Sequence, residues 1–193
     1  RLCRLLTTGN RRAKKGECHL VLGDLIADAR DLLLIVMPDR DRKNLGPLLP
    51  RLAEAAPGAL WLGATMLRQG DDRRRLAGLR TIAGSANIPL IATNDVLYAD
   101  PACRDLQDIL TCIREGRTLE NAGRLLEANA ERHLKHPGEM ARLFADCPEA
   151  MRETQVLLSR IDLPLARELF VRHALVGAAG AEGGVEGAPT AWR

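Results

Sequence analysis

Three short apolar runs in the first half of the chain constrain its fold more than any other feature. They cover residues 32–37, 59–63 and 88–92. Each has the length of a strand and carries no charged residue, which is typical of a strand buried on both faces of a parallel sheet. Parallel strands cannot be joined by a tight turn, so a crossover segment is expected between each pair.

Helical patterns fill the gaps between these runs. We predict helices over 47–56 and 71–87, whose apolar positions recur three or four residues apart: Leu48, Leu49, Leu52, Leu76, Leu79 and Ile82. The order strand, helix, strand, helix, strand predicts an α/β fold with right-handed crossovers, built on a parallel sheet or barrel. A further helix is predicted over 2–14, with Gly16 as its stop.

The chain becomes entirely helical after Asp100. Pro101 is predicted to open a helix that Gly116 closes. Its apolar positions are Leu106, Ile109, Leu110 and Ile113. Thr118 and Asn121 indicate a short turn, and Pro137 and Pro148 each begin another helix. Residues 169–193 are rich in Gly and Ala, and we expect this tail to be disordered because it has little apolar surface to bury.

Composition excludes several classes of partner. The formal net charge is only +3, so the whole chain has no strong electrostatic footprint for nucleic acid. With two Trp, one Tyr and two Phe, it also offers no aromatic platform for stacking single-stranded bases. No apolar run approaches the roughly 20 residues of a membrane helix.

The five cysteines are widely spaced and form no C-x-x-C pair. This pattern argues against a disulfide framework or a structural zinc site, and it favours reduced, buried thiols. We therefore expect a cytoplasmic protein without a membrane contact.

One strand end carries residues suited to chemistry. Asn94 and Asp95 follow the third apolar run, and functional residues of parallel α/β folds gather at the carboxyl ends of strands. Asp95 offers a hard oxygen ligand for a metal, and Asn94 is placed to orient it. The alternative is that Asp95 is a turn former or a helix cap.

Other polar residues have simpler interpretations. His133 and His136 are three apart, as metal ligands on one helix face are, but they lack an acid or Cys partner at ligand spacing, so we predict structural roles. Cys112 has no base beside it, which predicts buried packing and not a nucleophile. The charge run 71–75 is interpreted as a solvated helix start.

The chain resembles a known family at several places. Residues 93–96 (TNDV), 106–116 (LQDILTCIREG) and 126–144 (from LEANAERHLK to EMARLF) resemble the bacterial DNA polymerase III alpha subunit. Residues 9–20 (GNRRAKKGECHL) and 70–72 (GDD) resemble its error-prone branch. The resemblance covers roughly residues 1–168.

The resemblance implies the N-terminal polymerase-and-histidinol-phosphatase (PHP) domain of that subunit, a distorted (β/α) barrel. An intact PHP domain can hold Zn or Mn through His, Asp and Glu. Some members use the metals for exonuclease chemistry, whereas many serve only as a platform against the polymerase palm and thumb. The error-prone branch is tied to damage-induced translesion synthesis.

This sequence departs from the family at the motif Asn-Asp-Val-His-Tyr-His. Leu97 and Ala99 stand where the family has histidines, so Asp95 alone is carried over as a metal ligand. The family's first His-x-His pair lies upstream of Arg1. We therefore expect no cofactor on this segment, although the polymerase site of the parent would use Mg.

We expect a partial barrel over 1–100, a helical segment leading toward the palm over 101–168, and a disordered tail over 169–193, which we hypothesise is read out of frame. The expected function is that of a catalytically empty structural module of an error-prone DNA polymerase. It would pack against the rest of that chain and reach DNA and deoxynucleotides only through it. The alternative is a metal-dependent phosphoesterase or 3'-5' exonuclease of the PHP superfamily.

Overall fold

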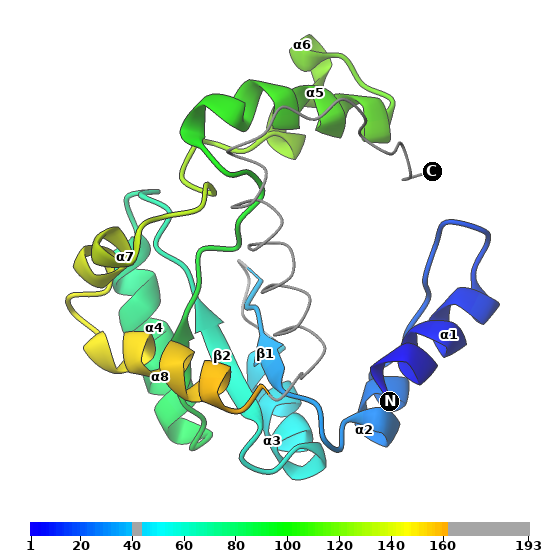
Figure 1. Ribbon diagram of the computed structural model, residues 1–193, viewed down its shortest axis with the longest axis vertical. Coiled ribbons are helices and arrows are strands. Elements are labelled where there is room, and N and C mark those ends of the chain that lie inside the picture. Colours follow the sequence, from blue (N-terminus) through cyan, green and yellow to red (C-terminus); the bar gives the residue numbers. More distant parts are fainter. Residues whose placement is uncertain (40–43, 162–193) are drawn as a thin grey trace, which may run out of the picture. The chain divides into compact units, whose positions relative to one another are not determined.

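The computed structural model describes residues 1–39 and 44–161 (Figure 1). The predicted tail over 169–193, with its hypothesised change of reading frame, lies outside the described residues. None of the described helices is long and apolar enough to span a membrane.

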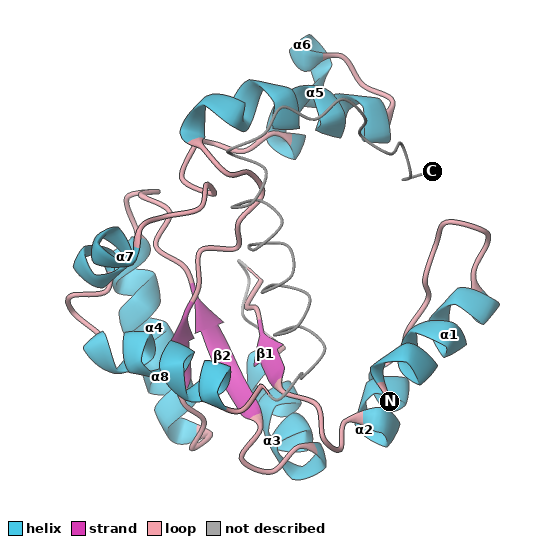
Figure 2. Cartoon of the chain, in the orientation of Figure 1, coloured by secondary structure: helices cyan, strands magenta, loops and turns pink. Residues whose placement is uncertain are grey.

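A three-stranded parallel sheet confirms the α/β prediction (Figure 2). Its strands are β1 (Leu34–Val36), β2 (Leu60–Ala64) and β3 (Leu90–Ala92), and they lie in chain order. The register pairs Leu34 with Leu60, and Leu62 with Leu90. Within the described residues the sheet is open and does not close into a barrel.

The two crossovers are helices, as predicted. Helix α3 (Leu45–Ala55) joins β1 to β2, and α4 (Asp72–Ser85) joins β2 to β3. Helix α4 stops where Asn87 takes a left-handed φ of 52°, a conformation that Asn tolerates better than most residues.

Strand β1 differs from the prediction. The run 32–37 was expected to be buried on both faces, but Ile35 is 41 % and Met37 43 % exposed. The physical reason is the cover over each face: Leu34 and Val36 pack on the core cluster, whereas Ile35 and Met37 lie outside it. Edge position alone does not explain this, because β3 is also an edge strand and is buried throughout. The chain at the end of β1 comes close to Gly63 of β2, where an added Cβ would clash with the Met37 sulfur.

The core forms where the sheet meets its helices. Leu49 of α3, Leu62 of β2 and Leu79 of α4 are almost wholly buried. Residues from the C-terminal helices α7 (Pro137–Leu143) and α8 (Pro148–Ser159) join the same cluster. Phe144, which follows α7, is completely buried there.

Several further helices complete the described chain. At the N-terminal end, α1 (Leu2–Arg12) was predicted and α2 (Leu22–Asp28) was not. After β3 come the 3-10 turn η1 (Pro101–Cys103), α5 (Arg104–Glu115), α6 (Leu119–Ala122) and the 3-10 turn η2 (Gly123–Leu125). Gly116 ends α5 with a left-handed φ of 62°, as expected for a helix C-cap glycine.

All five cysteines are free thiols, as predicted. The expectation that they are buried holds for Cys112 and Cys147 and is wrong for Cys3 and Cys18, which are exposed. Their exposure follows from their places on α1 and on the loop after it, outside the core cluster.

Candidate functional site

The carboxyl end of β3 continues into the loop that the sequence singled out. The amide of Thr93 donates to the Ala64 carbonyl at 2.8 Å, so the ladder extends one residue beyond β3 before the chain turns. Asp95 then takes a left-handed φ of 46°. Its amide donates to the Thr93 hydroxyl oxygen at 3.2 Å, which fixes the turn.

Asp95 is held by an arginine from a distant loop. Arg132 donates through one terminal nitrogen to the Asp95 carboxylate at 2.6 Å and through Nε to the Asp95 carbonyl at 2.8 Å. Its other terminal nitrogen donates to Glu127 at 2.6 Å. All three guanidinium nitrogens are therefore engaged, and the arginine supplies the positive charge that a metal would otherwise bring to Asp95.

Asn94 does not orient Asp95, contrary to the sequence interpretation. Its side chain is buried, and its amide nitrogen donates to the backbone carbonyls of Glu131 and His133. Its side-chain oxygen has no hydrogen-bond partner among the described residues. The Asn94 side chain therefore connects the loop after β3 to the segment 126–135, because both acceptor carbonyls belong to that segment.

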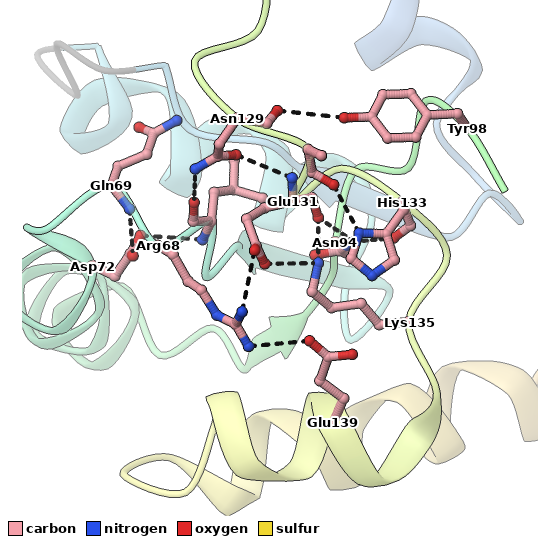
Figure 3. Close-up of polar contacts among 12 residues, drawn as sticks. Arg68, Gln69, Asp72, Asn94, Tyr98, Asn129, Glu131, His133, Lys135 and Glu139 are labelled. Carbon is pink, nitrogen blue, oxygen red and sulfur yellow. Dashed lines mark hydrogen bonds and ion pairs between the residues drawn. The ribbon is translucent and has the colours of Figure 1, made fainter. Parts of the chain in front are cut away.

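A second asparagine joins this segment to the carboxyl end of β2. Asn129 donates to the Leu67 carbonyl at 2.7 Å and accepts from the Glu131 amide at 3.0 Å (Figure 3). Backbone pairing adds to it, since Leu97 donates to the Arg132 carbonyl and Leu134 to the Tyr98 carbonyl. The loops after β2 and β3 are therefore both tied to 126–135.

Charged groups of opposite sign alternate along this contact. Glu131 lies between Arg68, at 3.2 Å, and Lys135, whose ammonium is 3.1 Å from the second carboxylate oxygen (Figure 3). Arg68 also reaches Glu139 at 3.2 Å. The Lys135 side chain is fully buried, so its charge depends on Glu131 for compensation.

The charge run 71–75 is only partly a solvated helix start. Asp72 is 9 % exposed and accepts the backbone amides of Leu67 and Gln69. Arg75 bridges Asp72, at 3.0 Å, to the Thr65 hydroxyl, at 2.9 Å. Burial of Asp72 and partial burial of Arg75 correct the prediction, and the cause is the loop after β2, whose amides need acceptors.

The side chains of His133 and His136 each contact a backbone group. A ring nitrogen of His133 lies 2.8 Å from the Ala130 carbonyl. His136 caps α7, where its Nδ1 accepts the Gly138 amide at 3.1 Å. Their side chains have separate backbone partners, so the pair is not arranged as a two-histidine metal site.

A cavity of about 1060 Å3 opens at the carboxyl ends of the strands. Its charged lining residues are Asp39, Arg68, Asp71, Arg75, Asp95, Arg124, Glu127 and Arg132. Across residues 1–39 and 44–161, no three His, Cys, Asp or Glu side chains converge as metal ligands would. With Leu97 and Ala99 offering no donor and Asp95 bound to Arg132, the donor set of the described residues does not fit the Zn or Mn that the family resemblance implies.

Comparison with known proteins gives a consistent match. The chain is 51 % identical over 168 residues to the error-prone DNA polymerase of Bradyrhizobium sp. (strain ORS 278), a match that covers 83 % of this chain and 14 % of the relative. It is 54 % identical over 157 residues to that of Sinorhizobium medicae (strain WSM419), covering 80 % and 14 %. For Brucella abortus biovar 1 (strain 9-941) the identity is 51 % over 166 residues, covering 85 % and 15 %. No family model matches the chain.

The chain is homologous to one segment of the error-prone DNA polymerases. It spans about one seventh of the length of these relatives. The resemblance drawn from the sequence motifs is thereby confirmed, including its error-prone branch. The names of these polymerases describe the whole relatives and not this segment of them.

Sequence reasoning missed the side chains that hold the site together. The sequence predicted no contact for Arg132, Glu131 or Lys135, which belong to a segment that resembles the polymerase family. Their partners lie far along the chain: Arg132 and Asp95 are 37 residues apart, and Arg68 and Glu131 are 63 apart. The one local signal was the density of Asn, Glu and Arg in 126–135, a segment without helical or strand periodicity.

Proposed function

We propose that this segment serves in an error-prone DNA polymerase as a structural module without metal chemistry of its own. It contributes to replication and damage-induced translesion synthesis in the cytoplasm only through the rest of the polymerase, which binds DNA and deoxynucleotides and holds Mg. Identity of about 51 % over four fifths of the chain supports the assignment to such a polymerase.

The observation that carries the structural role is the pairing of Asp95 with Arg132. The Asp95 carboxylate, 52 % exposed, accepts the guanidinium at 2.6 Å through one oxygen, so Arg132 balances its charge and competes with a divalent cation for it. The same pattern recurs at Asp72 with Arg75 and at Glu131 with Lys135. Arginine and lysine thus hold the carboxylates at this end of the sheet.

The finer fold assignment belongs to the same proposal. We assign residues 1–100 to part of a distorted PHP-type (β/α) barrel, and 101–168 to a helical segment leading toward the polymerase palm. The parallel order β1, β2, β3 with α3 and α4 as crossovers supports this, because consecutive (β/α) units of a barrel have that arrangement.

Metal content and nuclease activity test the proposal. The purified chain, supplied with Zn or Mn, is assayed for bound metal and for cleavage of single-stranded DNA. Asp95→Ala is compared with Asp71→Ala, because Asp71 is another carboxylate of the same cavity. We expect less than one metal per chain and no cleavage in any form. Stoichiometric metal with cleavage that Asp95→Ala abolishes and Asp71→Ala retains would establish the phosphoesterase alternative.

A further inference from the structure

Helix α5 presents its apolar side to solvent. Four large aliphatic residues recur at helical spacing on one side of it, and we call them the outer face of α5. They are Leu106 (58 % exposed), Ile109 (46 %), Leu110 (51 %) and Ile113 (72 %). Spacings of three and four residues put them on one continuous stripe. An amphipathic helix normally buries such a stripe, so this one lacks its cover among the described residues.

The opposite side of α5 is polar and buried. Asp108, Thr111 and Cys112 are each less than 10 % exposed. Asp108 lies 3.6 Å from Arg104, which in turn donates to the Glu127 carbonyl at 2.8 Å. The Arg104–Asp108 pair lies within α5, so the contact that fixes the rotation of the helix is the bond from Arg104 to the Glu127 carbonyl, which turning the outer face inward would break.

Two further exposed aliphatic side chains lie on the elements that follow α5. Helix α6 packs against α5, and its Leu119 is 55 % exposed; η2, which packs against α6, has Leu125 at 49 %. Clusters of exposed aliphatic side chains on a folded protein mark places where another surface binds. Because the stripe follows i, i+3, i+4 and i+7, it has the form of one partner in helix-to-groove packing.

The size of the stripe favours an occupant from the same polypeptide. A stable complex between separate molecules buries at least roughly 1,200 Å2 in total, which one helix about 18 Å long cannot supply by itself. A covalently linked segment needs no such area, since its effective concentration is in the millimolar range. The match covers 14 % of the Bradyrhizobium relative, so 86 % of such a polymerase remains to provide that segment.

We propose that the outer face of α5 is covered by an apolar segment of the polymerase polypeptide that lies outside the matched region. The inference rests on the proposed function and deepens it, because it names the surface through which the module joins the rest of the enzyme. None of the residues 1–39 and 44–161 covers this face.

A chimera tests the proposal. Residues of this chain replace the matched segment of the Sinorhizobium medicae polymerase, and hydrogen exchange of the α5 amides is compared between the chimera and the isolated chain. We expect at least ten-fold slower exchange in the chimera. The double variant Leu110→Gln, Ile113→Gln should return exchange to the rate of the isolated chain, since Gln keeps the helix but removes the apolar contact.

Leu134→Gln is the matched control, because Leu134 is 67 % exposed and lies outside α5. It should leave exchange in the chimera unchanged. Equal exchange in chimera and isolated chain, or an equal effect of Leu134→Gln, overturns the inference. If the isolated chain forms a dimer that the double variant abolishes, a second copy is the occupant and the inference is also wrong.

Primer extension separates the two proposals. If the chimera extends primers but its α5 amides exchange as fast as in the isolated chain, the docking inference is wrong and the proposed function is not affected. A chimera that fails to extend primers, where the native relative succeeds, overturns both.

Discussion

Helices α4 and α5 carry similar apolar spacing but use it in opposite ways. In α4, Leu76 and Leu79 are 3 % and 1 % exposed and belong to the main core. In α5, Leu110 and Ile113 are 51 % and 72 % exposed, and the buried side is polar. Periodicity in the sequence therefore defines the apolar face of a helix but does not say what covers that face.

The difference comes from connectivity. Helix α4 joins two adjacent parallel strands, and the handedness of that crossover places it on the sheet. Helix α5 follows β3 without returning to another described strand. It is fastened through Arg104 to the Glu127 carbonyl, a polar contact that leaves its outer face free.

The largest expected effect separates the two regions by stability. Phe144→Ala should lower the free energy of unfolding by about 3–5 kcal/mol, since it empties a completely buried site in the sheet core. Leu110→Ala should change it by no more than about 0.5 kcal/mol, because its side chain is half in water. Urea unfolding gives the free energy of unfolding of both variants. Equal losses of stability would contradict the contrast between the sheet core and the outer face of α5.

Replacing Glu131 should cause the second-largest loss of stability. Glu131→Ala leaves the buried Lys135 ammonium without its counter-charge and should cost about 3 kcal/mol. Lys135→Met places an apolar chain in the same space and should cost less than Glu131→Ala. Denaturant midpoints of the two variants give the order, and a reversed order would contradict this account of the buried charge.

Asn129 tests the fastening of 126–135 to the sheet. Asn129→Ala leaves the Leu67 carbonyl and the Glu131 amide without their partner and should cost about 2 kcal/mol. The control is Asn121→Ala, since Asn121 accepts one amide in an exposed capping box of α6 and should cost about 0.5–1 kcal/mol. Thermal or urea unfolding distinguishes the two.

The smallest expected effect is a pH dependence within the core. Burial, with a contribution from the Glu149 carboxylate, raises the pKa of the Cys147 thiol. The unfolded chain therefore loses this proton first as pH rises, so the stability present below the ordinary thiol pKa declines above it. Cys147→Ala should flatten the slope of stability between neutral pH and the alkaline range. Cys3→Ala, an exposed site, should leave the slope unchanged.

What the sequence could predict depended on local patterns. The apolar runs located the three strands of the described residues, and helix ends were predicted near Asn87 and Gly116, both of which have a left-handed φ. The open side of β1 could not be predicted, because burial depends on what covers each face of the strand, and β3, with one flanking strand like β1, is fully buried. The ion pair of Arg132 with Asp95 could not be predicted either, since Asp95 lies in a turn 37 residues away in the sequence.

Two glycines of the sheet region illustrate how differently a position can resist mutation. At Gly63 the backbone torsion is ordinary and the obstacles are side chains: Met37 first, then the methyl groups of Ile35 and Thr93 at 3.2 and 3.3 Å. Trimming Met37 would remove the worst of these contacts for Gly63→Ala. At Gly58 the space is empty, but φ is +65°, so no change in a neighbour relieves the strain of a larger residue. Which residues position 63 tolerates therefore depends on the side chain at position 37. Position 58 instead tolerates only residues that can adopt the left-handed region.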